Sequence, residues 1–162
     1  MTSSQHLRSI RLWLSIFIAG LILSGITAFP LEHETAWLAA FLAAHPILPR
    51  GIFVWIDRVH EALYQDSIHA PFLAYGTDWL AFAHLTLSVV FLGPLVNPVR
   101  NKWVMQFGLI ACAGVLALAL IAGPIRGIPP LCRLIDCSFG IFGAIPLLVA
   151  LRRTSKLELA QE

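Results

Sequence analysis

The chain has 162 residues, of which 58% are apolar and 12% are charged, and its mean hydropathy is +0.80. A soluble domain carries about twice that share of charged residues, so this chain has too few polar groups to cover a globule in water. The net charge of +2 is too small for a nucleic-acid-binding protein, and the three cysteines form no C-x-x-C pair of the kind found in zinc or redox sites. The composition therefore predicts an integral membrane protein without a nucleic-acid partner, and it excludes a disordered chain and a secreted disulfide scaffold.

Four apolar stretches are long enough to cross the hydrocarbon layer of a membrane, which takes about 20 helical residues. They cover about residues 12–29, 72–96, 103–121 and 131–151. None of them shows the period-two alternation of a barrel strand, so helices are the structure that satisfies their backbone in lipid. The expected fold is all-α: a single membrane domain over residues 1–162, built as a bundle of four transmembrane helices.

The connection between the first two spans contains two further predicted helices, over about residues 34–45 and 52–68. In the second of these, Ile52, Trp55, Ile56 and Val59 share one face at helical spacing, and polar residues occupy the other face. We expect both helices to be interfacial and to lie flat on the outer surface of the membrane.

Positive charges are unevenly distributed among the connections, and this pattern predicts the orientation of the chain. With the N-terminus inside, the cytoplasmic segments hold Arg8, Arg11, Arg100, Lys102, Arg152, Arg153 and Lys156, whereas the opposite side holds Arg50, Arg58, Arg126 and Arg133. Both termini are therefore expected in the cytoplasm. An alternative interpretation is a cleaved signal peptide, because Arg8 and Arg11 precede the first apolar run and Thr27-Ala28 closes it.

Two carboxylates fall at similar depth in the outer half of the predicted bundle. Asp78 lies about 10 Å below the start of the second span, and Asp136 lies about 8 Å below the start of the fourth. Ionisable side chains are costly in lipid, so they turn inward and pair. We expect both carboxylates to form a polar pocket with His84, Arg126 and Arg133. The alternative is a purely structural clasp, in which Arg133 pairs with Asp136 and Arg126 pairs with Asp78.

The residue types suggest roles within this pocket. Asp78 and His84 are the candidate catalytic pair for proton transfer, because imidazole titrates near neutral pH. The candidate ligand-binding residues are Arg126, Arg133, Asp136, Thr77 and Tyr75. Alternatively, His84 is a neutral imidazole that forms a hydrogen bond between helices. A haem is not expected, because no other span offers a histidine as second axial ligand.

A divalent metal is a further candidate cofactor. Asp57, His60 and Glu61 lie one turn apart on the second connecting helix, which is the spacing of metal ligands on helices. A complete site needs ligands from a second element, such as residues 32–34 or His45. The alternative is an ordinary solvated face of a surface helix.

Several segments carry a resemblance to known proteins: YGTDWLAFAHL (75–85), PVRN (98–101), GPIRGIP (123–129) and RLIDCSFG (133–140). They resemble a family of small bacterial four-helix inner-membrane proteins whose activity is uncharacterised. The resemblance covers most of residues 70–150. It implies a place in the bacterial inner membrane and carries no catalytic residue over to this chain.

The leading functional hypothesis is a pocket that binds or processes an amphiphilic or anionic, lipid-like small molecule. If the protein is an enzyme, its residue types favour isomerisation or hydrolysis by general acid–base chemistry. Two alternatives stay open. One is a proton- or ion-coupled carrier with a relay of Asp78, His84 and Asp136. The other is a non-catalytic subunit that assembles into an oligomer or a larger membrane complex.

Overall fold

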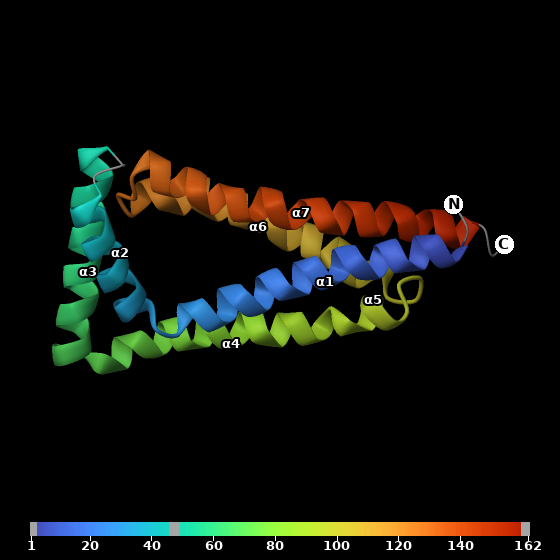
Figure 1. The fold of residues 1–162 in the computed structure, drawn as a ribbon, viewed down its shortest axis with the longest axis horizontal. Helices are drawn as coiled ribbons and strands as arrows, with labels where there is room; N and C mark the ends of the chain where they lie inside the picture. Colours follow the sequence, from blue (N-terminus) through green and yellow to red (C-terminus); the bar gives the residue numbers. More distant parts are fainter. Residues whose placement is uncertain (1–2, 46–48, 160–162) are drawn as a thin grey trace. The chain divides into compact units, whose positions relative to one another are not determined.

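The structure, a computed structural model, describes residues 3–45 and 49–159 of the chain. All the regular secondary structure in these residues is helical, which confirms the all-α prediction (Figure 1). The helices are α1 (Ser3–Ala28), α2 (Leu31–Ala44), α3 (Arg50–His69), the short 3₁₀ helix η1 (Pro71–Ala74), α4 (Tyr75–Val90), α5 (Leu92–Val96), α6 (Lys102–Ile125) and α7 (Pro130–Leu159).

Four helical stretches are long and apolar enough to cross a membrane, as predicted: Ser3–Ala28, Pro71–Val96, Lys102–Ile125 and Pro130–Leu159. Only 22% to 28% of the residues in the most apolar part of each stretch are buried inside the chain. Most of these apolar residues therefore need an apolar environment that the chain itself does not supply. Lipid supplies it, and the chain has the properties of a multi-pass membrane protein.

Two of these stretches extend well beyond the predicted spans. α1 begins at Ser3 instead of residue 12, and α7 continues to Leu159 instead of residue 151. Hydropathy marks the part of a helix that suits lipid, whereas the backbone hydrogen bonds continue into the polar segments that follow. Tertiary packing supports both extensions, because Ile10 and Leu157 are buried in the same cluster of side chains.

The predicted span 72–96 is interrupted near its end. α4 ends at Val90 and α5 begins at Leu92, with Pro94 in the first turn of α5. Proline has no N–H to donate to the carbonyl four residues earlier, and its ring crowds that carbonyl. The neighbouring hydrogen bonds are long, at 3.3 Å both from Phe91 N to Leu87 O and from Leu95 N to Phe91 O.

The helices form two compact units. Unit 1 comprises Met1–Ile22 and Thr86–Glu162, and unit 2 comprises Leu23–Leu85. Unit 1 thus holds most of α1, the end of α4, and α5 to α7. Unit 2 holds the end of α1, the connecting helices and most of α4. The predicted single domain and four-helix bundle stay predictions.

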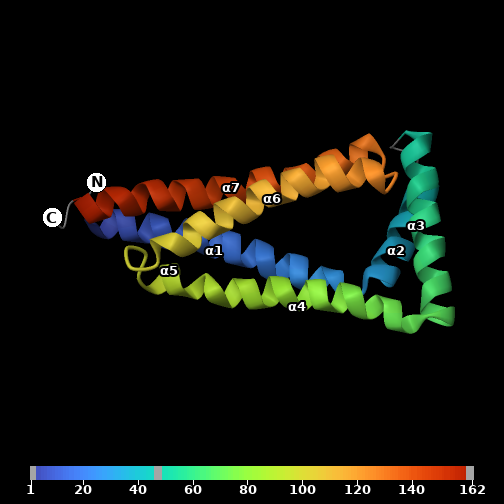
Figure 2. The same ribbon diagram turned by 180° about the vertical axis from the view of Figure 1, so that it is seen from behind.

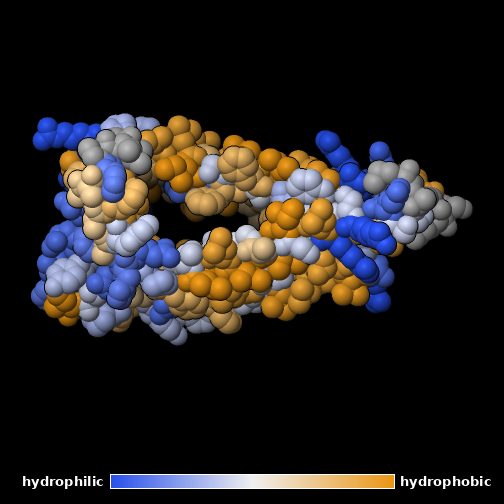
Figure 3. All heavy atoms as spheres, viewed as in Figure 1, coloured by the Kyte–Doolittle hydropathy of each residue, from blue (hydrophilic) through white to orange (hydrophobic). Residues whose placement is uncertain are grey.

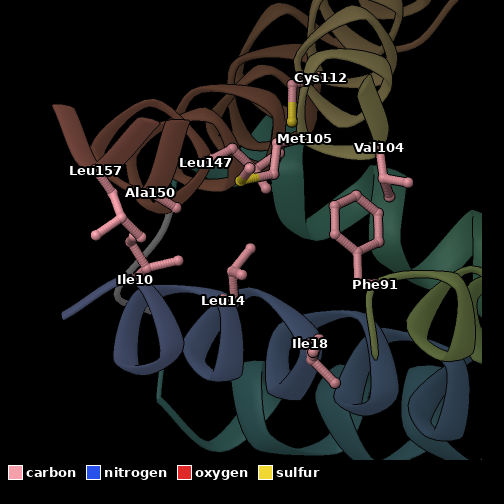
Figure 4. Close-up of a cluster of buried hydrophobic side chains, with 10 residues drawn as sticks. All are labelled: Ile10, Leu14, Ile18, Phe91, Val104, Met105, Cys112, Leu147, Ala150 and Leu157. Carbon is pink, nitrogen blue, oxygen red and sulfur yellow. The ribbon is translucent and has the colours of Figure 1, made fainter. Parts of the chain in front are cut away.

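In unit 1, α6 and α7 run antiparallel and contact each other along their length (Figures 1 and 2). α1 joins them through a core of buried side chains. Figure 4 shows Ile10 and Leu14 of α1 pointing toward Leu147 and Ala150 of α7. The full cluster is Ile10, Leu14, Ile18, Phe91, Val104, Met105, Cys112, Leu147, Ala150 and Leu157.

In unit 2, α2 and α3 pack against each other, and Leu42 and Ile52 are buried. The end of α1 meets α4 at Gly25, where a Cβ would lie 3.0 Å from the carbonyl oxygen of Ala81. Hydrophilic residues gather over α3, whereas the surface of α4 is mainly hydrophobic (Figure 3). The predicted connecting helices are therefore present, as α2 and α3.

An aromatic ladder, defined here as Tyr75, Trp79 and Phe82, follows one face of α4. The ring centroids are 6.0 Å apart between Tyr75 and Trp79 and 5.9 Å apart between Trp79 and Phe82, in edge-to-face geometry. All three rings are more than half exposed. Exposed aromatic rings near the end of an apolar helix are typical of the boundary between lipid and water.

Candidate functional site

The residues of the predicted pocket are divided between the two units. Thr77, Asp78 and His84 belong to unit 2, whereas Arg133 and Asp136 belong to unit 1. Of the two remaining residues, Tyr75 belongs to unit 2 and Arg126 belongs to unit 1. The convergence of Asp78 with Asp136, and the pairing of Arg126 with Asp78, therefore stay predictions.

Asp78 and His84 are both half-buried on α4, but they do not form a direct pair. They are six positions apart on the helix, which corresponds to about 9 Å along the axis and about 120° around it. His84 bonds to its own helix instead, with Nδ1 at 2.8 Å from the carbonyl oxygen of Leu80. Thr77 also forms a local bond, since its hydroxyl donates to the carbonyl oxygen of Ala74 in η1 at 2.6 Å. A proton cannot pass directly between Asp78 and His84 in this arrangement.

The hydrogen bond of His84 determines which nitrogen carries the proton in the neutral ring. A carbonyl oxygen only accepts, so Nδ1 of His84 must be the donor to Leu80. Nε2 is then left as an acceptor. The bond lies within α4, and the alternative of an imidazole that links two helices through Nδ1 is not what the structure shows.

Tyr75 is 61% exposed and is the first member of the aromatic ladder. Its described contact is the edge-to-face packing on Trp79. This environment suits a ring at a membrane boundary, whose hydroxyl reaches polar surroundings while its carbon atoms stay in apolar ones.

Arg133 and Asp136 lie in the first two turns of α7 and do not form the predicted ion pair. The aliphatic part of Arg133 instead lies over Gly123 of α6, where a Cβ would be 2.6 Å from Cδ of Arg133. Helical side chains lean toward the N-terminus of their helix, and this direction takes Arg133 away from a carboxylate one turn further on. The prediction of a clasp between Arg133 and Asp136 is therefore wrong.

The guanidinium group of Arg133 is left incompletely bonded. Its Nε is buried and has no hydrogen-bond partner in the part of the chain that the structure describes. Asp136 is half-buried a turn away. A buried N–H donor without an acceptor is costly, and an anion or another acceptor would relieve that cost. The group is thus suited to bind an anion.

Arg126 is held at the end of α6 by the turn that follows it. Gly127 has a φ of +70°, the left-handed conformation that ends many helices. The N–H of Ile128 reaches back to the carbonyl oxygen of Gly123 at 3.0 Å, and the N–H of Gly127 reaches that of Pro124 at 3.1 Å. The side chain of Arg126 is exposed at this turn, close in sequence to the start of α7.

The predicted metal ligands on α3 are not assembled into a site. Among the described residues, no group of three or more His, Cys, Asp or Glu side chains is placed to hold a metal ion. Glu61 accepts a hydrogen bond from Gln65 at 2.8 Å, and Asp57 is exposed. His60 lies next to the ring of Tyr64. These contacts are those of a polar helix face.

A basic cavity, defined by His6, Val149, Arg152, Arg153 and Lys156, was not among the predicted sites. It lies in unit 1, where α1 begins and α7 ends, and has a volume of about 270 Å³. The sequence signal is the pair Arg152-Arg153 directly after an apolar run, with Lys156 one turn later. From the sequence alone this signal indicates only orientation, because His6 is far away along the chain.

A scan against known protein families and searches of curated proteins and of solved structures find no match for this chain.

Proposed function

We propose that this chain is a multi-pass protein of the bacterial inner membrane that binds an amphiphilic, anionic, lipid-like molecule in its outer half. The observation that carries the proposal is the guanidinium group of Arg133, which is half-buried near the start of an apolar helix and has an unbonded Nε. The ligand would supply an anionic oxygen to this group and an apolar tail to the neighbouring surface.

The gathering of cationic side chains at one end of unit 1 supports an orientation with both termini in the cytoplasm. Arg11 Nε donates to the carbonyl oxygen of Leu95 at 3.3 Å, and Lys102 pairs with Glu158 at 2.7 Å. The start of α1, the start of α6 and the end of α7 therefore lie at the same end. Positively charged ends of membrane helices favour the cytoplasmic side.

The surroundings of Arg133 favour an amphiphile over a fully water-soluble anion. Leu134, the next residue on α7, is 63% exposed and lies about 100° around the helix from Arg133. An anionic head at the guanidinium group would leave its tail against the apolar surface of α7 that begins at Leu134. Arg126, exposed at the preceding turn, is the candidate second cation.

The connecting helices fit an interfacial position in this proposal. α3 carries its apolar residues on one face and its polar residues on the other, and α2 packs against it. Amphipathic helices of this kind lie in the plane of the membrane surface. α2 and α3 would then lie on the outer surface of the membrane.

The test uses Cys132, the neighbour of Arg133, as a reporter in the purified full-length protein. Cys132 is half-buried, whereas Cys112 and Cys137 are buried, so we expect a small alkylating reagent to modify Cys132 first. We expect dodecyl phosphate, an anionic amphiphile, to slow this alkylation, and neutral dodecyl maltoside at the same concentration to leave it unchanged. Mass spectrometry of the peptides identifies the modified residue.

The matched variants are Arg133→Gln and Arg50→Gln, which remove the same charge from the two units. Arg133→Gln should abolish the protection by dodecyl phosphate, and Arg50→Gln, at the exposed start of α3, should retain it. Circular dichroism confirms that both variants keep their helices. Equal protection in both variants would contradict the proposal.

A further inference from the structure

The basic cavity is built from two helices that are far apart in sequence. Val149, Arg152, Arg153 and Lys156 recur at helical spacing and line it from α7, and His6 lines it from α1. Buried contacts hold the two helices together at this point, since Ile10 of α1 and Leu157 of α7 belong to one core cluster. The cavity therefore depends on the fold and not only on a run of basic residues.

The titratable side chains that line the cavity are all bases: one imidazole, two guanidinium groups and one ammonium group. The carboxylate near the end of α7, Glu158, lies about half a turn around the helix from Val149. It is bound to Lys102 of α6 at 2.7 Å. Glu158 is thus directed toward α6, and Arg152 and Lys156 are the cations of the cavity that an anion would meet.

His6 adds a second, independent indication of a ligand. Its Nδ1 is buried and has no hydrogen-bond partner among the residues that the structure describes. His6 also lies in the first turns of α1, where the helix dipole contributes positive potential. A ring N–H of the imidazole can donate to an oxygen of a bound anion, and the anion would interact favourably with this end of the helix.

We infer that the basic cavity binds a phosphate group, and its position favours the headgroup of an anionic phospholipid. Val149 contributes an apolar wall, and Arg152 follows the apolar part of α7 directly. A volume of about 270 Å³ suits a headgroup better than a whole lipid. Basic cavities between membrane helices bind phospholipid headgroups in this way.

This site is separate from the one proposed around Arg133. Arg153 comes twenty positions after Arg133 on α7, which corresponds to about 30 Å along the helix. The basic cavity uses neither Arg133 nor Cys132, so either proposal can fail without the other.

The experiment measures ligand binding to the purified full-length protein in two arms. In the lipid arm, the protein is placed in phosphatidylcholine bilayers with or without phosphatidylglycerol, and lipid adducts are counted by native mass spectrometry. In the soluble arm, inorganic phosphate is titrated and the shift of the melting temperature is recorded. Binding by the lipid arm alone assigns the headgroup, and binding by the soluble arm alone assigns free phosphate.

The decisive variants are Arg152→Gln and Lys156→Gln, which should each weaken binding about fivefold, the effect of one basic residue near an anionic surface. Arg152→Lys keeps the charge and should retain binding. Val149→Phe keeps every charge but narrows the cavity, and it should also weaken binding. The matched control is Arg8→Gln, which removes an exposed charge from α1 that does not line the cavity.

The site is overturned if the cavity variants and Arg8→Gln respond alike in both arms, because the effect would then come from overall charge. It is also overturned if neither probe binds to the unmodified protein. Circular dichroism and the melting temperature without ligand show that each variant is folded. If Val149→Phe fails this check, the comparison of Arg152→Gln with Arg152→Lys still decides the question.

Discussion

Gly140 of α7 lies directly against the backbone of Cys112 of α6: a Cβ at position 140 would be 2.6 Å from the carbonyl oxygen of Cys112. A carbonyl oxygen in the middle of a helix cannot move aside as the end of a side chain can. The missing side chain of Gly140 therefore sets how closely α6 and α7 approach, as small residues do in other membrane helices.

Substitution of Gly140 by Ala should destabilise unit 1. Overpacking costs about 1–3 kcal/mol in well-packed cores, and this exceeds the gain in helix propensity of about 1 kcal/mol. Gly114→Ala is the matched control on α6, because nothing lies within 4 Å of a Cβ at that position. In thermal unfolding in detergent, Gly140→Ala should lower the melting temperature and Gly114→Ala should not. Equal effects would show that the close approach is not needed.

Asn101 stabilises the connection between α5 and α6 through two hydrogen bonds of its side chain. Its Nδ2 donates to the carbonyl oxygens of Gly93 at 3.1 Å and of Asn97 at 2.9 Å. Asn101→Ala removes both bonds and should destabilise the protein by roughly 1–3 kcal/mol, the cost of unsatisfied polar groups. Denaturant unfolding measures the change, with Gln106→Ala on the exposed side of α6 as control. A loss no larger than that of the control would refute this role.

The ion pair between Lys102 and Glu158 should contribute little to stability. Its atoms are 2.7 Å apart, but the two side chains are 30% and 40% exposed. Pairs in such surroundings are worth about 0–1 kcal/mol and weaken as salt is added. A double-mutant cycle with Lys102→Met and Glu158→Gln should give a coupling energy in this range. A coupling energy of several kcal/mol that does not change with salt would mean that the pair is effectively buried.

The ring of His84 should carry its proton on Nδ1 whenever it is neutral. This follows from its 2.8 Å bond to the carbonyl oxygen of Leu80. Nitrogen-15 NMR of the labelled protein separates the two neutral tautomers. His69, with Nδ1 at 3.0 Å from the carbonyl oxygen of Gln65, should behave alike, whereas Nδ1 of His60 has no described partner. Protonation of neutral His84 at Nε2 would contradict the structure.

The membrane helices could be predicted from the sequence, because each span depends on an apolar run that is visible without neighbours. Their ends could not. Leu157 extends α7 through contacts with α1, and such contacts are invisible to hydropathy. The interruption before α5 was within reach, since Pro94 cannot donate the hydrogen bond that a continuous helix needs.

The site was harder to predict because it depends on which helix faces meet. Arg133 and Asp136 are one turn apart, so an ion pair was a reasonable hypothesis. The structure instead places the side chain of Arg133 over Gly123. This contact exists only because α6 packs against α7, and the sequence does not show that packing. His6 was missed for the same reason, because its neighbours in the basic cavity lie near the other end of the sequence.

The order of the rings in the aromatic ladder has a consequence for the height of α4 in a bilayer. Tyr75 has a hydroxyl group, Trp79 has an N–H group and Phe82 is wholly apolar, so polarity falls along the helix. If α4 moved toward the bilayer centre by one helical turn, about 5.4 Å, the hydroxyl group of Tyr75 would leave the hydrated layer. A shift of the same size away from the bilayer centre would expose the phenylalanine ring to water, so the order of the three rings favours one depth for α4 in a membrane.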